Sequence, residues 1–118
     1  MLFSFLAAGT ALAADQSFDQ AAFDSLQKQG KPVLVAIHAD WCPTCKTQEM
    51  IVGELLKTPE LRAITALRVD FDNQKAAVKD FKVQYQSTLI VFRGNQEVGR
   101  STGDTHKERI AALLRKAI

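Results

Sequence analysis

Two long apolar runs interrupt an otherwise mixed pattern of polar and hydrophobic positions, and each predicts a buried strand. Residues 32–39 read PVLVAIHA, and residues 64–71 read ITALRVDF. Such runs, rich in Val, Ile and Leu, are typical of central strands that are covered on both faces. Further along, 87–92 (STLIVF) and 97–102 (EVGRST) flank the turn RGNQ and predict an antiparallel hairpin.

Apolar residues at helical spacing fill the intervals between these strands. The expected helices run from a Ser17 N-cap to about Gln29, over 46–57, over a short stretch at 58–60, from an Asn73 cap to about Phe81, and onward from an Asp104 cap. The main order is then α, β, α, β, α, β, β, α, with two βα crossovers before the hairpin. This order predicts one α/β domain with a central, mixed, four-stranded sheet and helices on both faces.

Length and charge indicate one globular domain that does not have nucleic acid as its main partner. The 118 residues suffice for one domain, and 47% of them are hydrophobic, an ordinary fraction for a globular protein. The formal charge is +2, and Lys and Arg are interleaved with Asp and Glu throughout. Since a phosphate-binding surface needs a clustered basic face, nucleic acid is not expected as a partner.

Residues 1–13 (MLFSFLAAGTALA) differ from the rest because they carry no charged side chain. They end in Ala-Leu-Ala, which fits a signal-peptidase site, although the usual Lys or Arg at the start is missing. The run is too short for a transmembrane helix, which needs about 20 apolar residues. We therefore expect an export signal, or else a hydrophobic N-terminal segment, ahead of a domain at 14–118.

An export signal predicts that the chain works in the bacterial periplasm or another exported compartment. The expected state is a monomer. If residues 1–13 are retained, a dimer formed through this apolar segment is the alternative.

The only two cysteines, Cys42 and Cys45, are separated by two residues and follow the first predicted central strand. At a helix N-terminus, unpaired N–H groups and the helix dipole stabilise an anion, so Cys42 is the candidate nucleophile. Cys45 lies one turn further in and is the candidate resolving thiol, which releases a mixed disulfide. Pro43 suits the first helical turn, and Thr44 is small.

Three neighbours complete the candidate site. Lys46 adds positive charge near the thiols, whereas Asp40 opposes it. Trp41 is expected to pack beside the pair, to shield it and to shape the surface that meets a substrate.

Two other uses of a cysteine pair remain open. A zinc site needs four ligands, and the other soft donors are His38 and His106, of which His38 lies only four residues before Cys42. No metal site is therefore predicted. A purely structural disulfide normally joins distant segments, because a four-residue loop constrains little of the unfolded chain. Redox exchange is the leading interpretation.

The stretch GKPVLVAIHADWCPTCK resembles the thioredoxin family, whose strand–WCxxC–helix signature it matches. Within that family, GKPV, ADWC and CK are similar to periplasmic thioredoxin-like domains, such as the C-terminal domain of the DsbD-type reductant conduit. The resemblance covers 17–118 and implies a thioredoxin fold and thiol–disulfide exchange. It further implies a redox-active Cys42–Cys45 disulfide in place of a cofactor, protein thiols and disulfides as substrates, and a membrane protein as electron donor.

The chain departs from the family pattern before the third main strand. Ser87, followed by Thr88, occupies the position of a proline whose preceding peptide bond is cis in the family. A non-proline cis bond costs about 3 kcal/mol, so a trans bond is predicted before Ser87. The Ser87 hydroxyl is expected to bond the Cys42 thiolate or to offer an oxygen to a metal.

A second departure lies beneath the cysteines. Ala36 stands where thioredoxins carry a buried Asp, and Arg68 stands where they carry its Lys partner. The acid that assists deprotonation of the buried cysteine is therefore absent from its usual position, which puts turnover of the thioredoxin kind in question.

Two hypotheses follow. The first is an exported thiol–disulfide oxidoreductase that works on the reductant side through its CPTC pair. The alternative is a thioredoxin-fold module without turnover, whose two cysteines bind a metal or a partner protein.

Overall fold

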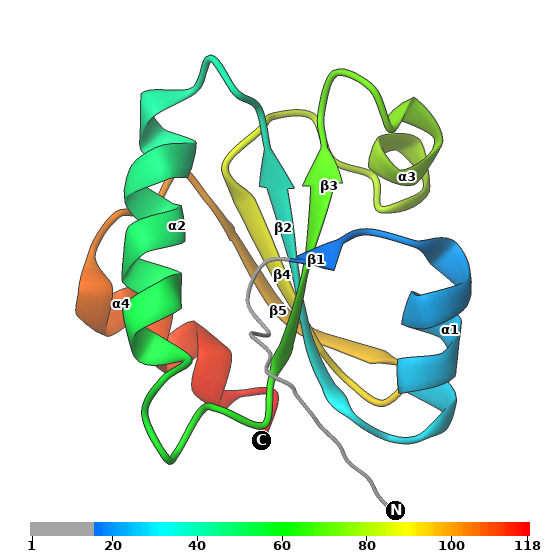
Figure 1. Ribbon diagram of the computed structural model, residues 1–118, viewed down its shortest axis with the longest axis vertical. Coiled ribbons are helices and arrows are strands. Elements are labelled where there is room, and N and C mark those ends of the chain that lie inside the picture. The colour runs from blue at the N-terminus through cyan, green and yellow to red at the C-terminus, as the bar shows by residue number, and fades with distance from the viewer. Residues whose placement is uncertain (1–15) are drawn as a thin grey trace, which may run out of the picture.

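The computed structural model describes residues 16–118, in which helices cover both faces of one mixed sheet (Figure 1). The strands are β1 (Gln16–Ser17), β2 (Pro32–His38), β3 (Thr65–Asp70), β4 (Thr88–Arg93) and β5 (Gln96–Thr102). Their order across the sheet is β1-β3-β2-β4-β5. The first three strands of that order run parallel, whereas β4 is antiparallel to both β2 and β5. The predicted α/β class and the predicted hairpin are confirmed.

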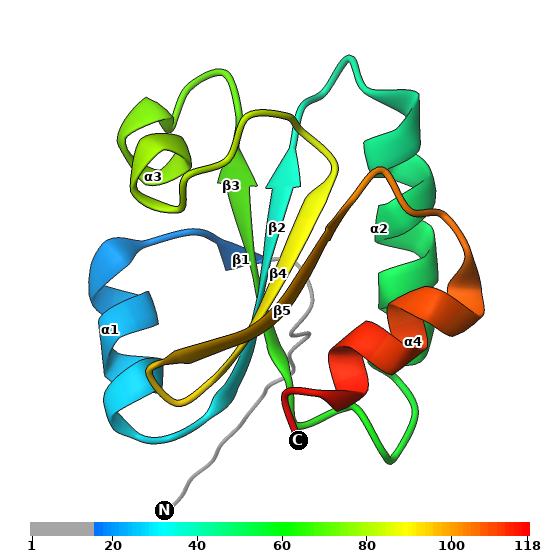
Figure 2. The same cartoon turned by 180° about the vertical axis from the view of Figure 1, so that it is seen from behind.

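The helices lie in two layers, one on each side of the sheet. They are α1 (Gln20–Lys28), α2 (Pro43–Leu55), α3 (Lys75–Asp80) and α4 (Lys107–Arg115). Figures 1 and 2 show α2 and α4 together on one face and α1 and α3 on the other, so helices cover both faces as predicted. Within 16–118, no helix is both long and apolar enough to cross a membrane.

Alternating side chains along β2 build a separate core on each face of the sheet. Val33, Val35 and Ile37 join the core under α1 and α3, whereas Leu34 joins the core under α2 and α4. The first core also holds aromatic rings with centroids 5.1 to 5.9 Å apart, from Phe18, Phe23, Phe81 and Phe92. Burial on both faces explains why residues 32–39 are almost continuously apolar.

The expected four-stranded sheet is wrong by one strand. β1 adds a fifth, two residues long, which pairs in parallel with β3 through Gln16↔Leu67 and Ser17↔Arg68. Two residues carry no detectable periodicity, so the hydrophobic pattern could not reveal this strand. Ser17 therefore lies in a strand and does not cap α1. The cap is Asp19, whose Oδ2 accepts a hydrogen bond from the Ala22 N–H at 3.0 Å.

Several expected helix ends also differ. α2 begins three residues earlier than predicted, at Pro43, because Cys42 is its N-cap. The short helix expected at 58–60 is instead part of a run of turns. α3 follows Gln74 without a side-chain cap. The cap position of α4 is His106, whose N–H donates to Asp104 Oδ1 at 2.9 Å, so Asp104 supports the helix from outside it.

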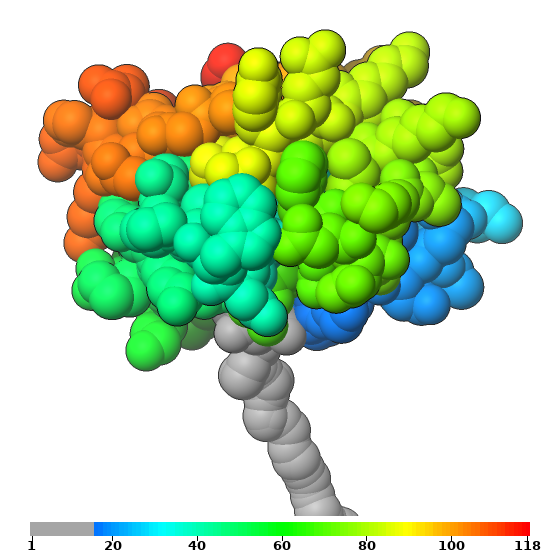
Figure 3. All heavy atoms as spheres, turned by 90° about the horizontal axis from the view of Figure 1, so that it is seen from above, coloured from blue at the N-terminus to red at the C-terminus, as the bar shows by residue number. Residues whose placement is uncertain are grey.

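The carboxyl ends of β2 and β3 lie at one edge of the sheet, where β4 begins. Seen from above this edge, the start of α2, the segment after β3 and the segment before β4 form one continuous surface (Figure 3). Gln48 of α2 is buried and joins the helix to two loops at this edge by hydrogen bonds. Its Nε2 donates to the carbonyl oxygens of Ser87 at 3.1 Å and of Asp104 at 2.8 Å. The edge therefore collects segments that are far apart in the sequence.

Candidate active site

Both cysteines lie at this edge, at the N-terminus of α2. Cys42 is the N-cap, and its Sγ accepts a hydrogen bond from the Cys45 N–H at 3.1 Å. Pro43 occupies the first turn, where its missing N–H removes no helical bond. The local sequence thus places a sulfur where the helix offers a free N–H donor. Such a donor stabilises negative charge on the sulfur.

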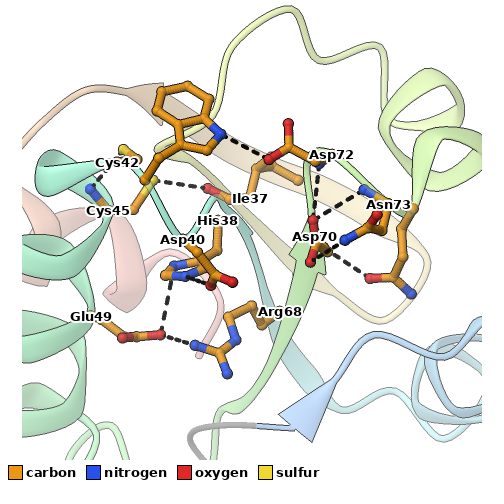
Figure 4. Close-up of polar contacts among 12 residues, drawn as sticks. Ile37, His38, Asp40, Cys42, Cys45, Glu49, Arg68, Asp70, Asp72 and Asn73 are labelled. Atoms are coloured by element: carbon orange, nitrogen blue, oxygen red, sulfur yellow. Dashed lines mark hydrogen bonds and ion pairs between the residues drawn. The ribbon is translucent and has the colours of Figure 1, made fainter.

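Cys45 has a different environment. Its Sγ lies 3.7 Å from the Ile37 carbonyl oxygen of β2 and can donate to it (Figure 4). Burial raises the pKa of the Cys45 thiol to about 11, and the hydrogen bond with Cys42 acts in the same direction. Both cysteines are thiols in this structure. The proton of Cys45 is therefore strongly held.

Exposure alone does not separate the two thiols, since Cys42 is 2% and Cys45 3% exposed. Their surroundings do separate them. Cys45 lines a partly open cavity of about 70 Å³ between the sheet and α2, and Cys42 is not among its lining residues. Cys45 therefore faces the space under α2, and its role as the resolving thiol stays a prediction.

Trp41 directly precedes Cys42 in the sequence and lies at the surface. It is 60% exposed, and its indole Nε1 donates to Asp72 Oδ2 at 2.8 Å. That bond links the end of β2 to the segment after β3. The side chain is thus a tethered surface residue, whereas Phe71 packs against the cysteines from below. Thr44 is half-buried, and Pro43 and Lys46 are exposed beside it.

Ser87 takes a backbone conformation that few non-glycine residues adopt, with φ at +57°. Its N–H donates to the Ile37 carbonyl at 2.8 Å, and its carbonyl accepts from Gln48 and from the Gly103 N–H. Its hydroxyl donates to the Gln86 carbonyl at 2.6 Å. The expected hydrogen bond from this hydroxyl to Cys42 is therefore wrong, because the hydroxyl donates to the Gln86 carbonyl instead. The trans bond before Ser87 stays a prediction.

Thr88, the residue after Ser87, fixes the start of β4. Its hydroxyl donates to the Tyr85 carbonyl at 2.8 Å and lies 2.9 Å from the Thr102 hydroxyl of β5. Thr88 therefore shapes the edge by holding two strands and the preceding loop, without contacting either sulfur.

We expect Ser87→Pro to lower the free energy of unfolding by about 2 kcal/mol or more, since proline requires φ near −65° and has no N–H for Ile37. Ser87→Gly, which tolerates a positive φ, should be as stable as the parent or slightly more stable. Urea unfolding followed by circular dichroism checks both. A proline variant as stable as the parent would contradict this account of the loop.

Ala36 and Arg68 are direct neighbours in the parallel register of β2 and β3, as their expected positions require. No carboxylate stands at 36, but one reaches the same region from α2. Glu49 forms an ion pair with Arg68 Nη1, and its Oε2 lies 3.8 Å from His38 Nδ1 (Figure 4). Sequence reasoning missed Glu49. The sequence feature that could have revealed Glu49 is its spacing of four residues from Cys45, which places both side chains on one face of a helix.

Metal ligation is the other chemistry that a cysteine pair can support. Across the part of the chain that the structure describes, no group of three or more His, Cys, Asp or Glu side chains is arranged to hold an ion. His38 instead faces Asp40 Oδ1 at 3.2 Å, and His106 begins α4.

Comparison with known proteins identifies this arrangement. The thioredoxin family model matches residues 11–116. A thioredoxin of Chlamydia trachomatis serovar D is 33% identical over 84 residues, which cover 71% of this chain and 80% of that protein. The crystal structure of Trxlp from Edwardsiella tarda EIB202 covers 85% of this chain and 97% of its own, with 44% identity and a TM-score of 0.82.

One further relative is much longer than this chain. The bifunctional thioredoxin reductase/thioredoxin of Mycobacterium leprae is 33% identical over 97 residues, which cover 82% of this chain but only 20% of that protein. The similarity therefore concerns one part of it. The fold, the family match and the paired cysteines at a helix N-terminus agree, and the chain belongs to the thioredoxin family of thiol–disulfide oxidoreductases.

Proposed function

We propose that this chain is an exported oxidoreductase that exchanges disulfides with protein thiols through Cys42 and Cys45, working on the reductant side. The observation that carries the proposal is the pairing of the sulfurs at the α2 N-terminus, where the Cys45 N–H donates to Cys42 Sγ at 3.1 Å. This donor favours the thiolate of Cys42, the form that attacks a disulfide.

The proposed cycle needs only the two thiols and a protein disulfide. The Cys42 thiolate attacks one sulfur of the substrate, forms a mixed disulfide and expels the other substrate sulfur as a thiolate, which takes up a proton. Cys45 then loses its proton and attacks Cys42 Sγ. The second substrate sulfur leaves as a thiol, and the Cys42–Cys45 disulfide remains. Two electrons pass to the substrate, so a donor must reduce the chain again.

The surface around the pair suits a protein partner. Trp41 and Tyr85 are 60% and 62% exposed, and they come from two of the segments that meet at this edge. Exposed aromatic residues of this kind are enriched at protein interfaces. The similarity of the GKPV and ADWC segments to DsbD-type domains supports a membrane protein as donor. The apolar residues 1–13, which lie outside the described residues, support export to the periplasm. We propose a monomer.

Equilibration of the pair with a glutathione buffer tests the direction of exchange. We expect a reduction potential below about −200 mV, in the range of reductants and well under the value of about −120 mV that marks a strong oxidant. The fraction of reduced protein is measured by alkylation of free thiols and mass spectrometry. A potential near the oxidant value would contradict the reductant role while leaving exchange itself intact.

A further inference from the structure

The cavity behind Cys45 connects the resolving thiol with a carboxylate. It measures about 70 Å³, and its wall is largely apolar, from residues such as Leu34, Val52 and Leu89. Cys45 lines one part of it and Glu49 another. A space of this size with polar groups on its wall has room for at least one water molecule.

Glu49 is the one carboxylate among the residues that line the cavity. Its side chain is 38% exposed, so it contacts both the cavity and solvent. The side chain of Arg68 in β3 is 39% exposed and forms the ion pair with Glu49 from the sheet that α2 covers. Figure 4 shows Glu49, Arg68 and His38 converging from α2, β3 and β2 below the cysteine pair. A proton that reached Glu49 could leave to solvent directly.

Three other charged or titratable side chains lie near Glu49, from Arg68, His38 and Asp40. The Arg68 guanidinium has no acceptor site for a proton. The two ring nitrogens of His38 face carboxylates, with Nε2 3.2 Å from Asp40 Oδ1 and Nδ1 3.8 Å from Glu49 Oε2. Asp40 itself has a side chain 96% exposed and does not line the cavity. Glu49 is the carboxylate on the cavity wall that can accept a proton, and the imidazole of His38, which also lines the cavity, lies beside it.

The resolving step requires such an acceptor. Burial raises the pKa of the Cys45 thiol to about 11. At neutral pH a thiol whose pKa is raised by burial is almost entirely protonated, yet the thiolate is the attacking form. Without a base, resolution of the mixed disulfide would be limited by this small fraction.

We propose that Glu49 is the proton acceptor of Cys45, through water in the shared cavity, and that this acid on α2 takes the part that Ala36 leaves open on β2. The inference rests on the proposed exchange reaction. As Cys45 Sγ attacks Cys42 Sγ, its proton passes through the water to the Glu49 carboxylate. The Cys42–Cys45 bond forms, and the bond from Cys42 to the substrate sulfur breaks. The leaving thiolate carries away the electron pair, and Glu49 returns its proton to solvent.

The reaction of reduced protein with dithiobis(nitrobenzoate) separates the two steps. Attack by Cys42 releases one coloured thionitrobenzoate, and resolution by Cys45 releases the second. At high reagent concentration the first phase outpaces the second. We expect Glu49→Gln to slow the second phase at pH 7 by about 100-fold, the low end for general-base catalysis, and to leave the first unchanged.

The pH profile distinguishes a proton acceptor from a merely structural residue. The gap between Glu49→Gln and the parent should narrow as the pH rises from 6 to 10 toward the pKa of Cys45, because that thiol then ionises without help. Glu49→Asp should recover part of the rate. Arg68→Gln removes the ion pair but keeps the carboxylate, so it should preserve the pH profile of the parent.

Glu54→Gln is the matched control, since Glu54 lies on the same helix and pairs with Lys107 at the surface. It should leave both phases unchanged. A second phase of parental rate in Glu49→Gln, or one slowed equally at every pH, would overturn the proposal. Loss of the first phase in the parent would instead overturn the proposed exchange function. Ion pairs as exposed as Glu49–Arg68 contribute little to stability, so Glu49→Gln is expected to fold.

Discussion

Cys42→Ser is expected to abolish catalysed reduction of a protein disulfide such as that of insulin, and Cys45→Ser is expected to abolish turnover at a later step. A serine hydroxyl is not appreciably ionised at neutral pH, so the first variant has no sulfur nucleophile at the α2 N-terminus. The second keeps that nucleophile but cannot release the substrate. Both should fall to the rate of uncatalysed reduction by dithiothreitol, which insulin precipitation measures.

The unfolding transition of each variant is the control for this result. Serine is close to cysteine in size, and its hydroxyl can replace the sulfur in the two contacts that the thiols make, from the Cys45 N–H to Cys42 and from Cys45 to the Ile37 carbonyl. Both variants should therefore unfold cooperatively in urea, as the parent does. Parental turnover in either variant would contradict the two-cysteine mechanism.

Leu34→Ala should lower the free energy of unfolding by about 3 kcal/mol, within the range measured for buried leucines. Leu34 is fully buried in β2 and packs in the core under α2 and α4. It also lines the cavity behind Cys45, so the truncation enlarges a space that already measures about 70 Å³. Because the rigid sheet and α2 bound this space, little collapse can offset the loss. Urea unfolding gives the change directly.

Leu26 supplies the comparison for that experiment. It lies on α1 and is only partly buried against the opposite core. Leu26→Ala should cost about 1 kcal/mol, because less apolar surface is removed from water in the folded state. Equal losses for the two variants would show that Leu34 is not the tightly packed residue described above.

The sequence predicted the main strands well because burial on both faces leaves a direct mark. The apolar run at 32–39 contains β2, in which Val33 and Leu34 pack into the cores on opposite faces of the sheet. Helix ends were predicted less well. Ser17, Asn73 and Asp104 are all good capping residues by type, but the path of the chain decides which residue sits at the end of a helix.

The candidate site was predictable only as far as it is local. Cys42 and Cys45 are three positions apart, and their placement at a helix N-terminus follows from the strand–CxxC–helix order. The contacts of Gln48 and Glu49 depend on how α2 packs on the sheet. Gln48 bonds to Ser87 and Asp104, which are 39 and 56 positions further along the chain. Glu49 pairs with Arg68, which is 19 positions further along. Such contacts leave no periodic signal in the sequence.

Ser87 shows the same limit in another form. Its type suggests a hydroxyl directed at the nearby sulfur. In the structure the hydroxyl donates instead to the carbonyl of Gln86, the preceding residue. Ser87 itself has a positive φ, which sets the direction of the local backbone. A backbone conformation of this kind is not encoded by hydrophobic pattern, and serine is not a residue that predicts it.

The most direct test of the account is to identify the sulfur that holds the substrate in a trapped mixed disulfide. Cys45→Ser and Cys42→Ser are each mixed with a disulfide-bonded protein, quenched with acid and digested for peptide mass mapping. The account predicts an abundant adduct on Cys42 of the first variant and little or none on Cys45 of the second, whose thiol lines the cavity under α2 and is firmly protonated. An adduct that forms mainly on Cys45, or no adduct in either variant, would contradict it.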